Sequence, residues 1–155
     1  MSVTYEVIVA SILESDDRFL CIEENLGGQL MLNQPAGRLQ VGESPAHGAA
    51  RETIEQAGYS ILPTHVVGIY EYFDTTTSTI FLRIAYAGAL FAPDGMNSRG
   101  RDPDISAVRW LTYDELERNR DRHRSPYVLR CIDDFRAGKS YPLDLISHFP
   151  AFPVA

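Results

Sequence analysis

Alternation of apolar and polar residues divides the chain into strands, helices and short connections. Runs rich in β-branched and aromatic residues predict strands at 4–13, 18–23, 65–73, 78–90 and 105–111, with shorter extended segments at 30–33 and 59–62. The polar stretch 14–17 indicates that the first two strands form a hairpin, and Asp74–Thr77 indicates a second hairpin between 65–73 and 78–90.

The clearest helix signal lies at residues 45–57. Ser44 followed by Pro45 is typical of an N-cap and a first helical position, and Gly58 is typical of a C-terminal stop. The alanines of this segment, together with Ile54, are expected to form the side that packs on the domain.

Two further helices are expected after the strand at 105–111. Thr112 and Glu115 have the spacing of a capping box, and Ser125-Pro126 opens a helix that Gly138 ends. Before that strand, residues 92–104 form a long polar loop. Antiparallel-looking strands with helices inserted singly predict an α+β fold, with a mixed sheet that carries helices on its faces.

Composition narrows the class of protein. The 155 residues suit a single domain covering 1–155, and 45% hydrophobic with 23% charged residues is an ordinary globular mixture. A net charge of −7 with scattered Arg and Lys disfavours nucleic acid as a partner. No apolar run is long enough to span a membrane, and the first residues lack the pattern of a signal peptide. Two cysteines without a disulfide framework fit a reducing cytoplasm.

Candidate chemistry gathers on the helix at 45–57. Glu52, Glu55 and Gln56 are three and four positions apart, so they share one face of that helix. A solvated acidic face explains most such clusters on helices. Carboxylates held together repel one another unless a cation lies between them, and hard oxygen ligands suit Mg²⁺ or Mn²⁺.

The spacing upstream of this face favours the metal. Gly37, Glu43, Arg51-Glu52, Glu55 and Gly58 follow one another in a pattern that resembles the Nudix box, GX5EX7REUXEEXGU with U apolar. Gly37 follows Gln34-Pro35-Ala36, so we expect it to occupy a turn that requires an unusual backbone conformation.

Three positions depart from the box. Gln56 stands where the family has the second Glu of its EE pair, Thr53 stands where an aliphatic residue is usual, and Tyr59 fills the last apolar position. An amide oxygen can coordinate a hard cation but carries no charge, so Gln56 predicts a weaker metal site or one that depends on a carboxylate elsewhere.

The resemblance implies an α/β/α sandwich with a mixed β-sheet and metal-dependent hydrolysis of a phosphoanhydride. It implies that Arg51 pairs with Glu43 and serves the catalytic site. It also implies that Glu52, Glu55 and Gln56 hold Mg²⁺ or Mn²⁺, and that Glu52 takes the proton from the attacking water.

Further site residues are expected outside the helix. Asp104 occupies a position from which relatives bring another carboxylate to the metal, and Asp102 is a second candidate for the base. Asp104 fits a turn residue after Pro103 equally well. Arg38 could bind substrate phosphate, because a guanidinium matches phosphate oxygens, or it could face solvent.

Segments at both ends of the chain indicate a subgroup. Residues 33–37 (NQPAG), 124–126 (RSP) and 141–143 (YPL) resemble a group of bacterial Nudix phosphatases. The members of that group release phosphate from nucleoside tri- and diphosphates and act on the pyrophosphates of thiamine and its pyrimidine precursor.

Two other functions remain open at this level. One is hydrolysis of a different nucleoside-diphosphate substrate, such as a dinucleoside polyphosphate or a sugar nucleotide. The other is a catalytically impaired nucleotide-binding Nudix module, because Gln56 replaces a metal-ligand Glu. In each case the expected partner is a small phosphorylated molecule, and the chain is expected to be a monomer or a homodimer.

Overall fold

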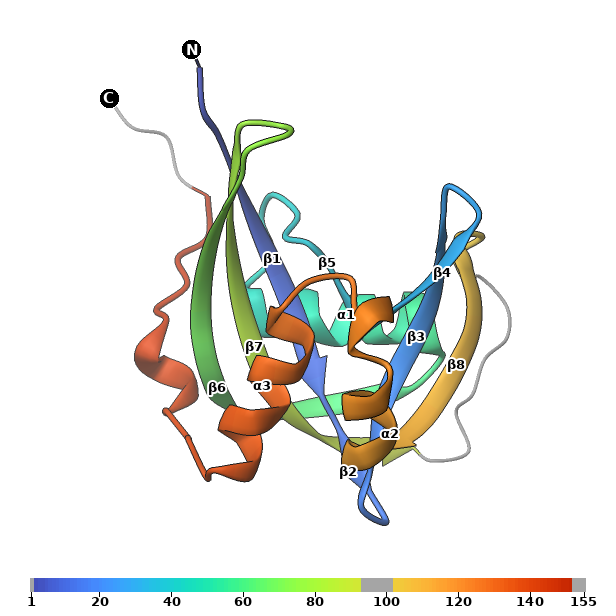
Figure 1. Ribbon diagram of the computed structural model, residues 1–155. Coiled ribbons are helices and arrows are strands. Elements are labelled where there is room, and N and C mark those ends of the chain that lie inside the picture. The colour runs from blue at the N-terminus through green and yellow to red at the C-terminus, as the bar shows by residue number, and fades with distance from the viewer. Residues whose placement is uncertain (1, 93–101, 152–155) are drawn as a thin grey trace.

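The computed structural model of the chain describes residues 2–92 and 102–151, so most of the predicted loop at 92–104 lies outside the described residues. Figure 1 shows the elements in chain order. They are β1 (Thr4–Ile12), β2 (Glu14–Ser15), β3 (Arg18–Leu26), β4 (Gln29–Asn33), β5 (Ala36–Arg38), α1 (Pro45–Ala57), β6 (Ser60–Asp74), β7 (Thr79–Ala92), β8 (Ile105–Thr112), α2 (Tyr113–Arg118), η1 (Arg120–Arg122), α3 (Tyr127–Arg136) and η2 (Leu143–Leu145).

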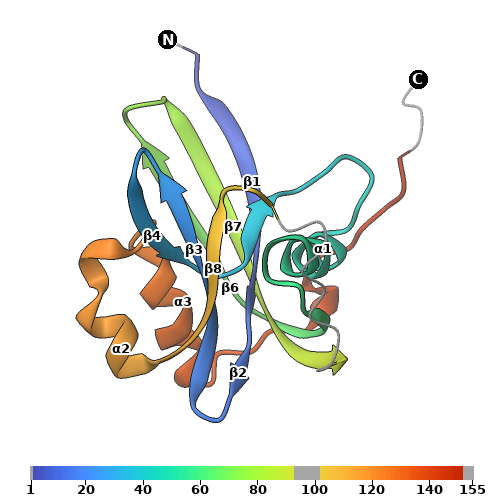
Figure 2. The same ribbon diagram turned by 90° about the vertical axis from the view of Figure 1, so that its right-hand side faces the viewer.

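The strands form two sheets. The first has the order β5-β1-β7-β6, in which β1 runs parallel to β7, and the other neighbours are antiparallel. In the second sheet β3 lies between β4 and β8 and also pairs with β2, always antiparallel. Figure 2 shows α1 on one side of the strands and α2 with α3 on the other. This is the expected α+β fold with a mixed sheet between helices.

The predicted hairpin between 4–13 and 18–23 is wrong in its pairing. The turn exists, with Asp16 and Asp17 at positive φ, but only the two residues of β2 pair back onto β3. β1 instead lies between β5 and β7 in the other sheet. Turn residues determine the turn, whereas the sheet partner depends on burial of the whole strand, and Val9 and Ile12 are fully enclosed in their sheet.

Helix α1 has the predicted bounds, and its alanines pack on the domain as predicted, but Ile54 does not. Ser44 Oγ accepts a hydrogen bond from the backbone N–H of His47 at 3.2 Å, and Gly58 closes the helix at φ 78°. Ile54 is 47% exposed, whereas the polar Thr53 is fully buried. Thr53 Oγ1 donates to the carbonyl of Ala49 at 2.8 Å and lies 2.9 Å from Ser11 Oγ on β1. Hydrogen bonds between helix and strand therefore replace the apolar contact expected at this position.

The expected strands at 59–62 and 65–73 are one continuous strand. β6 runs through Pro63 with shifts of register against β7 at three points, one of them between Pro63 and His65. Pro63 lacks a backbone N–H, and a bulge accommodates it without ending the strand. The hairpin predicted at Asp74–Thr77 is confirmed, because Asp74 pairs with Thr79.

Helices α2 and α3 cover the largest of the three core clusters that the described residues form. Thr112 and Glu115 form the predicted capping box at the start of α2. Both cysteines, Cys21 on β3 and Cys131 on α3, are buried as free thiols in this cluster. Beyond α3, Tyr141 exchanges two backbone hydrogen bonds with Val66, so the segment after α3 packs along β6.

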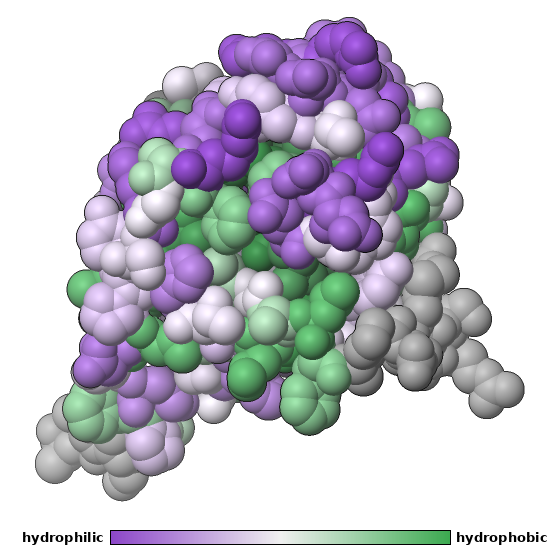
Figure 3. Space-filling model, turned by 90° about the horizontal axis from the view of Figure 1, so that it is seen from below, coloured by the Kyte–Doolittle hydropathy of each residue, from purple (hydrophilic) through white to green (hydrophobic). Residues whose placement is uncertain are grey.

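One face of the molecule carries apolar side chains in contact with solvent. Figure 3 shows them gathered across the middle of the underside, with hydrophilic side chains along its upper rim. Leu62 and Phe91, near the paired ends of β6 and β7, are 59% and 75% exposed.

Within the described part of the chain, no helix has the length and apolar character needed to cross a membrane.

Candidate active site

The site is built where α1 meets β5. Gly37 is not in a turn with unusual φ, as we expected, but in β5, where it pairs with Val9 of β1. A Cβ at Gly37 would lie 2.2 Å from Cδ of Glu52 and 2.3 Å from its Oε1. Glycine is therefore required here for space, because the carboxylate of Glu52 rests directly on the strand backbone.

Arg51 ties the acidic side chains of the site together. Its Nε and one terminal nitrogen donate to both oxygens of Glu43, at 2.8 and 2.7 Å, which confirms the expected pair. The other terminal nitrogen donates to Glu52 Oε1 at 2.8 Å and to Glu55 Oε2 at 2.9 Å. The arginine also reaches the carbonyl of Arg38 on β5 at 3.1 Å. One guanidinium thus links helix, strand and the loop between them.

The two buried carboxylates experience opposite electrostatic effects. The hydrogen bonds from Arg51 hold the pKa of Glu43 below its usual range. Burial raises the pKa of Glu52 above its usual range, and the nearby Arg51 only partly offsets this shift. Ionised Glu52 would therefore be stabilised by an additional cation.

Gln56 is 6% exposed, and its amide forms two hydrogen bonds with one residue of β5. Its Oε1 accepts from the backbone N–H of Ala36 at 2.9 Å, and its Nε2 donates to the carbonyl of Ala36 at 2.8 Å. The predicted role of Gln56 as a metal ligand stays a prediction.

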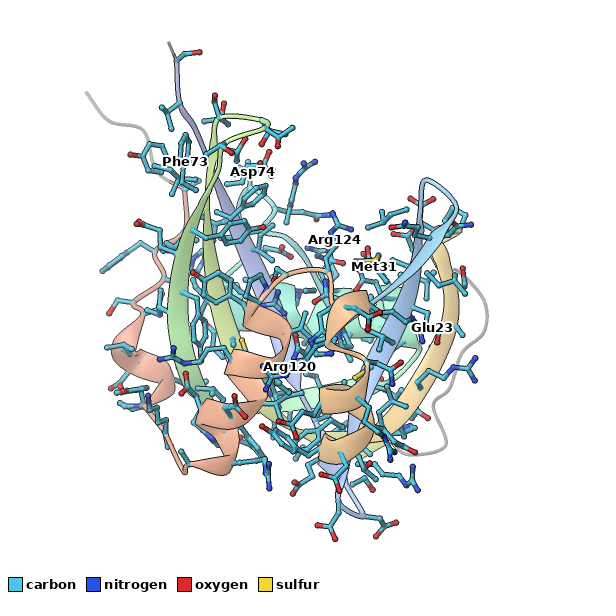
Figure 4. The ribbon with its side chains drawn as sticks, in the orientation of Figure 1. Glu23, Met31, Phe73, Asp74, Arg120 and Arg124 are labelled. Carbon is cyan, nitrogen blue, oxygen red and sulfur yellow. The ribbon has the colours of Figure 1, made fainter. Side chains whose placement is uncertain are left out.

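Some of these residues line a cleft of about 400 Å³ between the two sheets. Helix α1 contributes Glu52 and Gln56 to what we call the helical end, together with Gly37 and Asp102, whereas Arg51 and Glu55 are not among the lining residues. A second group of lining residues forms an aromatic and cationic wall, which includes Tyr72, Phe81, Arg83, Arg124 and Ser125. Tyr72 stacks on Phe81 with ring centroids 5.0 Å apart. Figure 4 shows Arg124 in the space between the sheets, beside Met31 of β4.

Hydrogen bonds connect the side chains of the cationic wall to one another and to neighbouring strands. Arg83 is 5% exposed, and one of its terminal nitrogens donates to the amide oxygens of Asn33 and Gln34. Asn33 in turn donates to Glu24 at 3.2 Å, and Glu24 accepts from Arg124 at 3.2 Å. The hydrogen bonds of Arg83 to Asn33 and Gln34 go to neutral amides, so they leave the charge of its guanidinium uncompensated.

The structure brings some of the predicted residues into the cleft and not others. Arg38 lines it, but its side chain is 75% exposed and its Nε forms an ion pair with Glu6 at 2.6 Å. Asp102 lines the cleft, and its backbone N–H donates to the carbonyl of Glu55. Asp104 is not among the lining residues, and its backbone N–H donates to Asp102 Oδ1 at 2.9 Å.

The sequence analysis reached part of the cationic and aromatic wall. Arg124 and Ser125 lie in the segment 124–126, on which the resemblance to the subgroup rests. Tyr72, Phe81 and Arg83 were missed, because an aromatic residue on a strand is more often part of the core. The alternation along β7, which places Phe81 and Arg83 on the same face of the sheet, was the signal available for those two.

The donor set at the helical end suits a divalent cation. In the described ranges 2–92 and 102–151, no group of three His, Cys, Asp or Glu side chains could hold a metal by itself. Mg²⁺ is commonly held by one or two carboxylates, with waters and substrate phosphates completing its shell. Glu52 and Glu55 are the candidates for these two carboxylates, and the contact of Glu52 with Gly37 fixes the position of one of them.

Comparison with known proteins identifies the class. The family model described as NUDIX domain matches residues 4–130. The chain therefore belongs to the Nudix family, whose members hydrolyse phosphoanhydrides in small phosphorylated substrates and generally use divalent metal ions. It is a Nudix hydrolase of the bacterial phosphatase kind.

Individual relatives agree with this assignment. The chain is 33% identical over 145 residues to Phosphatase NudJ of Escherichia coli K12 and of Shigella sonnei, which covers 92% of this chain and 91% of each relative. A solved NUDIX hydrolase from Nitrosomonas europaea has 38% identity and a TM-score of 0.86, and covers 94% of this chain and 98% of its own. The MutT NUDIX hydrolase from Burkholderia pseudomallei, with 16% identity and a TM-score of 0.70, covers 84% of this chain and 98% of its own. It supports the fold alone.

Proposed function

We propose that the protein hydrolyses a phosphoanhydride in nucleoside tri- or diphosphates, or in the pyrophosphates of thiamine and its precursor, with Mg²⁺ or Mn²⁺. The observation that carries this proposal is that two kinds of group line a single cleft. Glu52 and Gln56 of α1 line it, and so do the aromatic Tyr72 and the cationic Arg83 and Arg124. Such a cleft suits a molecule with phosphates at one end and a planar ring at the other.

The residues of the helical end have distinct roles in this reaction. Glu52 accepts the proton of the attacking water while the water oxygen bonds to phosphorus and the bond to the bridging oxygen breaks. Arg51 holds Glu52 in place through Oε1, and in the described part of the chain no hydrogen bond reaches Glu52 Oε2. That oxygen is therefore available to accept the proton.

The residues expected to hold the metal are Glu52 and Glu55, with Asp104 and the cleft-lining Asp102 as the further candidates. Gln56 would have to give up a hydrogen bond to Ala36 to join them. Once bound, the ion would neutralise phosphate charge and lower the pKa of a coordinated water. Arg38 and Arg124 would bind substrate oxygens at the mouth of the cleft. Both are sufficiently exposed to exchange their present carboxylate partners for phosphate.

Hydrolysis of a panel of substrates, with the products separated by chromatography, tests this proposal. The panel contains nucleoside tri- and diphosphates, thiamine pyrophosphate, a dinucleoside polyphosphate and a sugar nucleotide, each with Mg²⁺, with Mn²⁺ and with EDTA. We expect metal-dependent hydrolysis of the nucleoside tri- and diphosphates or of thiamine pyrophosphate, and a fall in kcat of about 10²-fold or more in Glu52→Gln. Glu14→Gln on the exposed strand β2 makes the same charge change outside the cleft and serves as the control.

Other outcomes lead to different conclusions. Turnover confined to the dinucleoside polyphosphate or the sugar nucleotide would replace the proposed substrates. Nucleotide binding by calorimetry without turnover of any substrate would support a binding module and reject the catalytic proposal.

We infer from composition that the protein works in the cytoplasm on a small substrate without nucleic acid, as a monomer or a homodimer. The acidic net charge supports the absence of nucleic acid, and the two buried free thiols fit a reducing compartment. Sedimentation with and without a DNA or RNA oligonucleotide checks both the oligomeric state and the absence of binding.

A further inference from the structure

The hydrogen bonds of Gln56 resemble those between two paired strands. β5 is an edge strand, because its one neighbour in the sheet is β1. Gly37 faces β1, so the backbone groups of Ala36 and Arg38 point to the free side. Gln56 gives Ala36 both the acceptor and the donor that a neighbouring strand would supply, and Arg51 caps the carbonyl of Arg38.

A carboxylate at position 56 could not do the same. An ionised Glu accepts hydrogen bonds but donates none, so it could satisfy the N–H of Ala36 and not its carbonyl. The carbonyl would then lie beside a carboxylate oxygen without a donor, in a place where Gln56 is 6% exposed. The amide is therefore the side chain that completes the edge of β5.

This edge supports the catalytic carboxylate. Ala36 precedes Gly37, and the carboxylate of Glu52 lies so close to Gly37 that a Cβ there would overlap it. Any shift of β5 away from α1 would remove the surface on which Glu52 rests. Glu52 and Gln56 lie one helical turn apart, so the same turn of α1 both fastens the strand and presents the carboxylate to the cleft.

We propose that Gln56 is a positioning residue and not an uncharged substitute for a metal ligand. Its hydrogen bonds to Ala36 fasten β5 to α1, so that the carboxylate of Glu52 keeps its contact with Gly37. The catalytic part of this inference rests on the proposed function. The fastening part concerns the chain alone and is testable without substrate.

Two measurements without substrate test the fastening. In Gln56→Met, which keeps the length of the side chain and removes both polar groups, the amide hydrogen of Ala36 exchanges faster with solvent. The amide of Ser11, which donates to Pro35 on the other side of β5, serves as the internal reference. In EDTA, we expect Gln56→Glu to have a lower melting temperature than the wild type. Gln29→Glu makes the same change on an exposed part of β4 and should keep the wild-type melting temperature.

Metal binding and kinetics separate this role from that of a ligand. We expect Gln56→Glu to bind Mn²⁺ no more tightly than the wild type, and to lose about tenfold or more in kcat with little change in KM, because misplaced catalytic groups slow the chemical step. The kcat of the wild type and that of Gln56→Glu are both measured well below the melting temperature of the variant.

Three results would overturn the proposal. The first is that Gln56→Glu binds Mn²⁺ about tenfold more tightly than the wild type. The second is that the Ala36 amide exchanges at an unchanged rate in Gln56→Met, and the third is that Gln56→Glu keeps the wild-type kcat although its melting temperature has fallen. If the wild type turned over no phosphoanhydride, the proposed function would fail, whereas amide exchange, melting and Mn²⁺ titration would still decide whether Gln56 fastens β5.

Discussion

Arg51 is the residue on which the electrostatic balance of the site depends. It is 16% exposed at the side chain and contacts three carboxylates, two of which are also mostly buried. Removing one partner of a buried ion pair leaves charges uncompensated. We expect Arg51→Met to lower the free energy of unfolding by about 3 kcal/mol in urea titrations.

An exposed pair provides the comparison for Arg51. Arg120 and Glu117 lie 3.2 Å apart with side chains 63% and 48% exposed. Arg120→Met should cost less than about 1 kcal/mol, because solvent screens such pairs. Equal losses in the two variants would show that Arg51 is no more than a surface arginine.

The contact between Gly37 and Glu52 predicts a coupled effect of two substitutions. Gly37→Ala should lower the free energy of unfolding by about 2 kcal/mol, because the added methyl group overlaps the carboxylate of Glu52. The same substitution in a Glu52→Ala background should cost much less, because the overlapping group is gone. Urea titration of the four proteins gives the coupling energy, and additive effects would contradict the described contact.

The residues of α1 were accessible from the sequence, as were Arg124 and Ser125 through the segment 124–126, whereas Tyr72, Phe81 and Arg83 were not. The spacing of Arg51, Glu52 and Glu55 is local, so a helix fixes their relation before any tertiary contact is known. Arg83 faces the cleft because of the position of β7 in its sheet. A pattern of alternation indicates that a strand has two faces, without identifying the face that meets the cleft.

At the scale of elements, local signals gave the bounds of α1 and the hairpin of β6 and β7, but not the partners of β1 and β5. Ser44, Pro45 and Gly58 gave the bounds of α1 because caps act within one turn of the helix. β5 was mistaken for a turn at Gly37, and β1 was assigned the wrong neighbour. Both errors concern pairing between distant parts of the chain, for which turn residues carry no information.

The packing of α3 on β6 predicts a response to acid. Asp134 of α3 accepts a hydrogen bond from Tyr70 of β6 at 2.7 Å and forms ion pairs with Arg130 and Lys139. Burial alone would raise the pKa of Asp134, but the hydrogen bonds from Tyr70 and Lys139 outweigh it and lower the pKa below the ordinary value of 3.8. Its contribution to stability is therefore complete well above 3.8 and is lost as the pH falls through the lower folded-state pKa.

Asp134→Asn tests this response. At pH 7 the variant should be less stable by about 2 kcal/mol, because the carboxylate gives up charge-assisted hydrogen bonds. Below about pH 4 the melting temperatures of the two proteins should converge, because the carboxylate of the wild type then becomes protonated. A constant difference in melting temperature from pH 7 to pH 3 would show that the charge of Asp134 does not stabilise the packing.

At the scale of the whole molecule, the proposed metal site couples ion binding to folding. Folding brings Glu52 and Glu55 to the edge of β5, and the unfolded chain lacks this arrangement. A cation that binds the folded chain raises its stability by RT ln(1 + [L]/Kd), about 2.7 kcal/mol at a concentration of 100 Kd. We expect Mg²⁺ to raise the melting temperature of the EDTA-treated wild type, but not that of Glu52→Gln. Na⁺ at equal ionic strength is the control, and an equal rise with Na⁺ would indicate screening alone.

The position of β1 between β5 and β7 has a consequence for synthesis of the chain. β1 leaves the ribosome before its partner does, because Thr4 to Ile12 pair with Thr79 to Ala87, which follow several seconds later at ordinary rates of translation. During that interval one edge of β1, with its apolar residues, lacks the neighbour that it has in the folded chain. A nascent chain that pauses before residue 79 is therefore expected to need a chaperone.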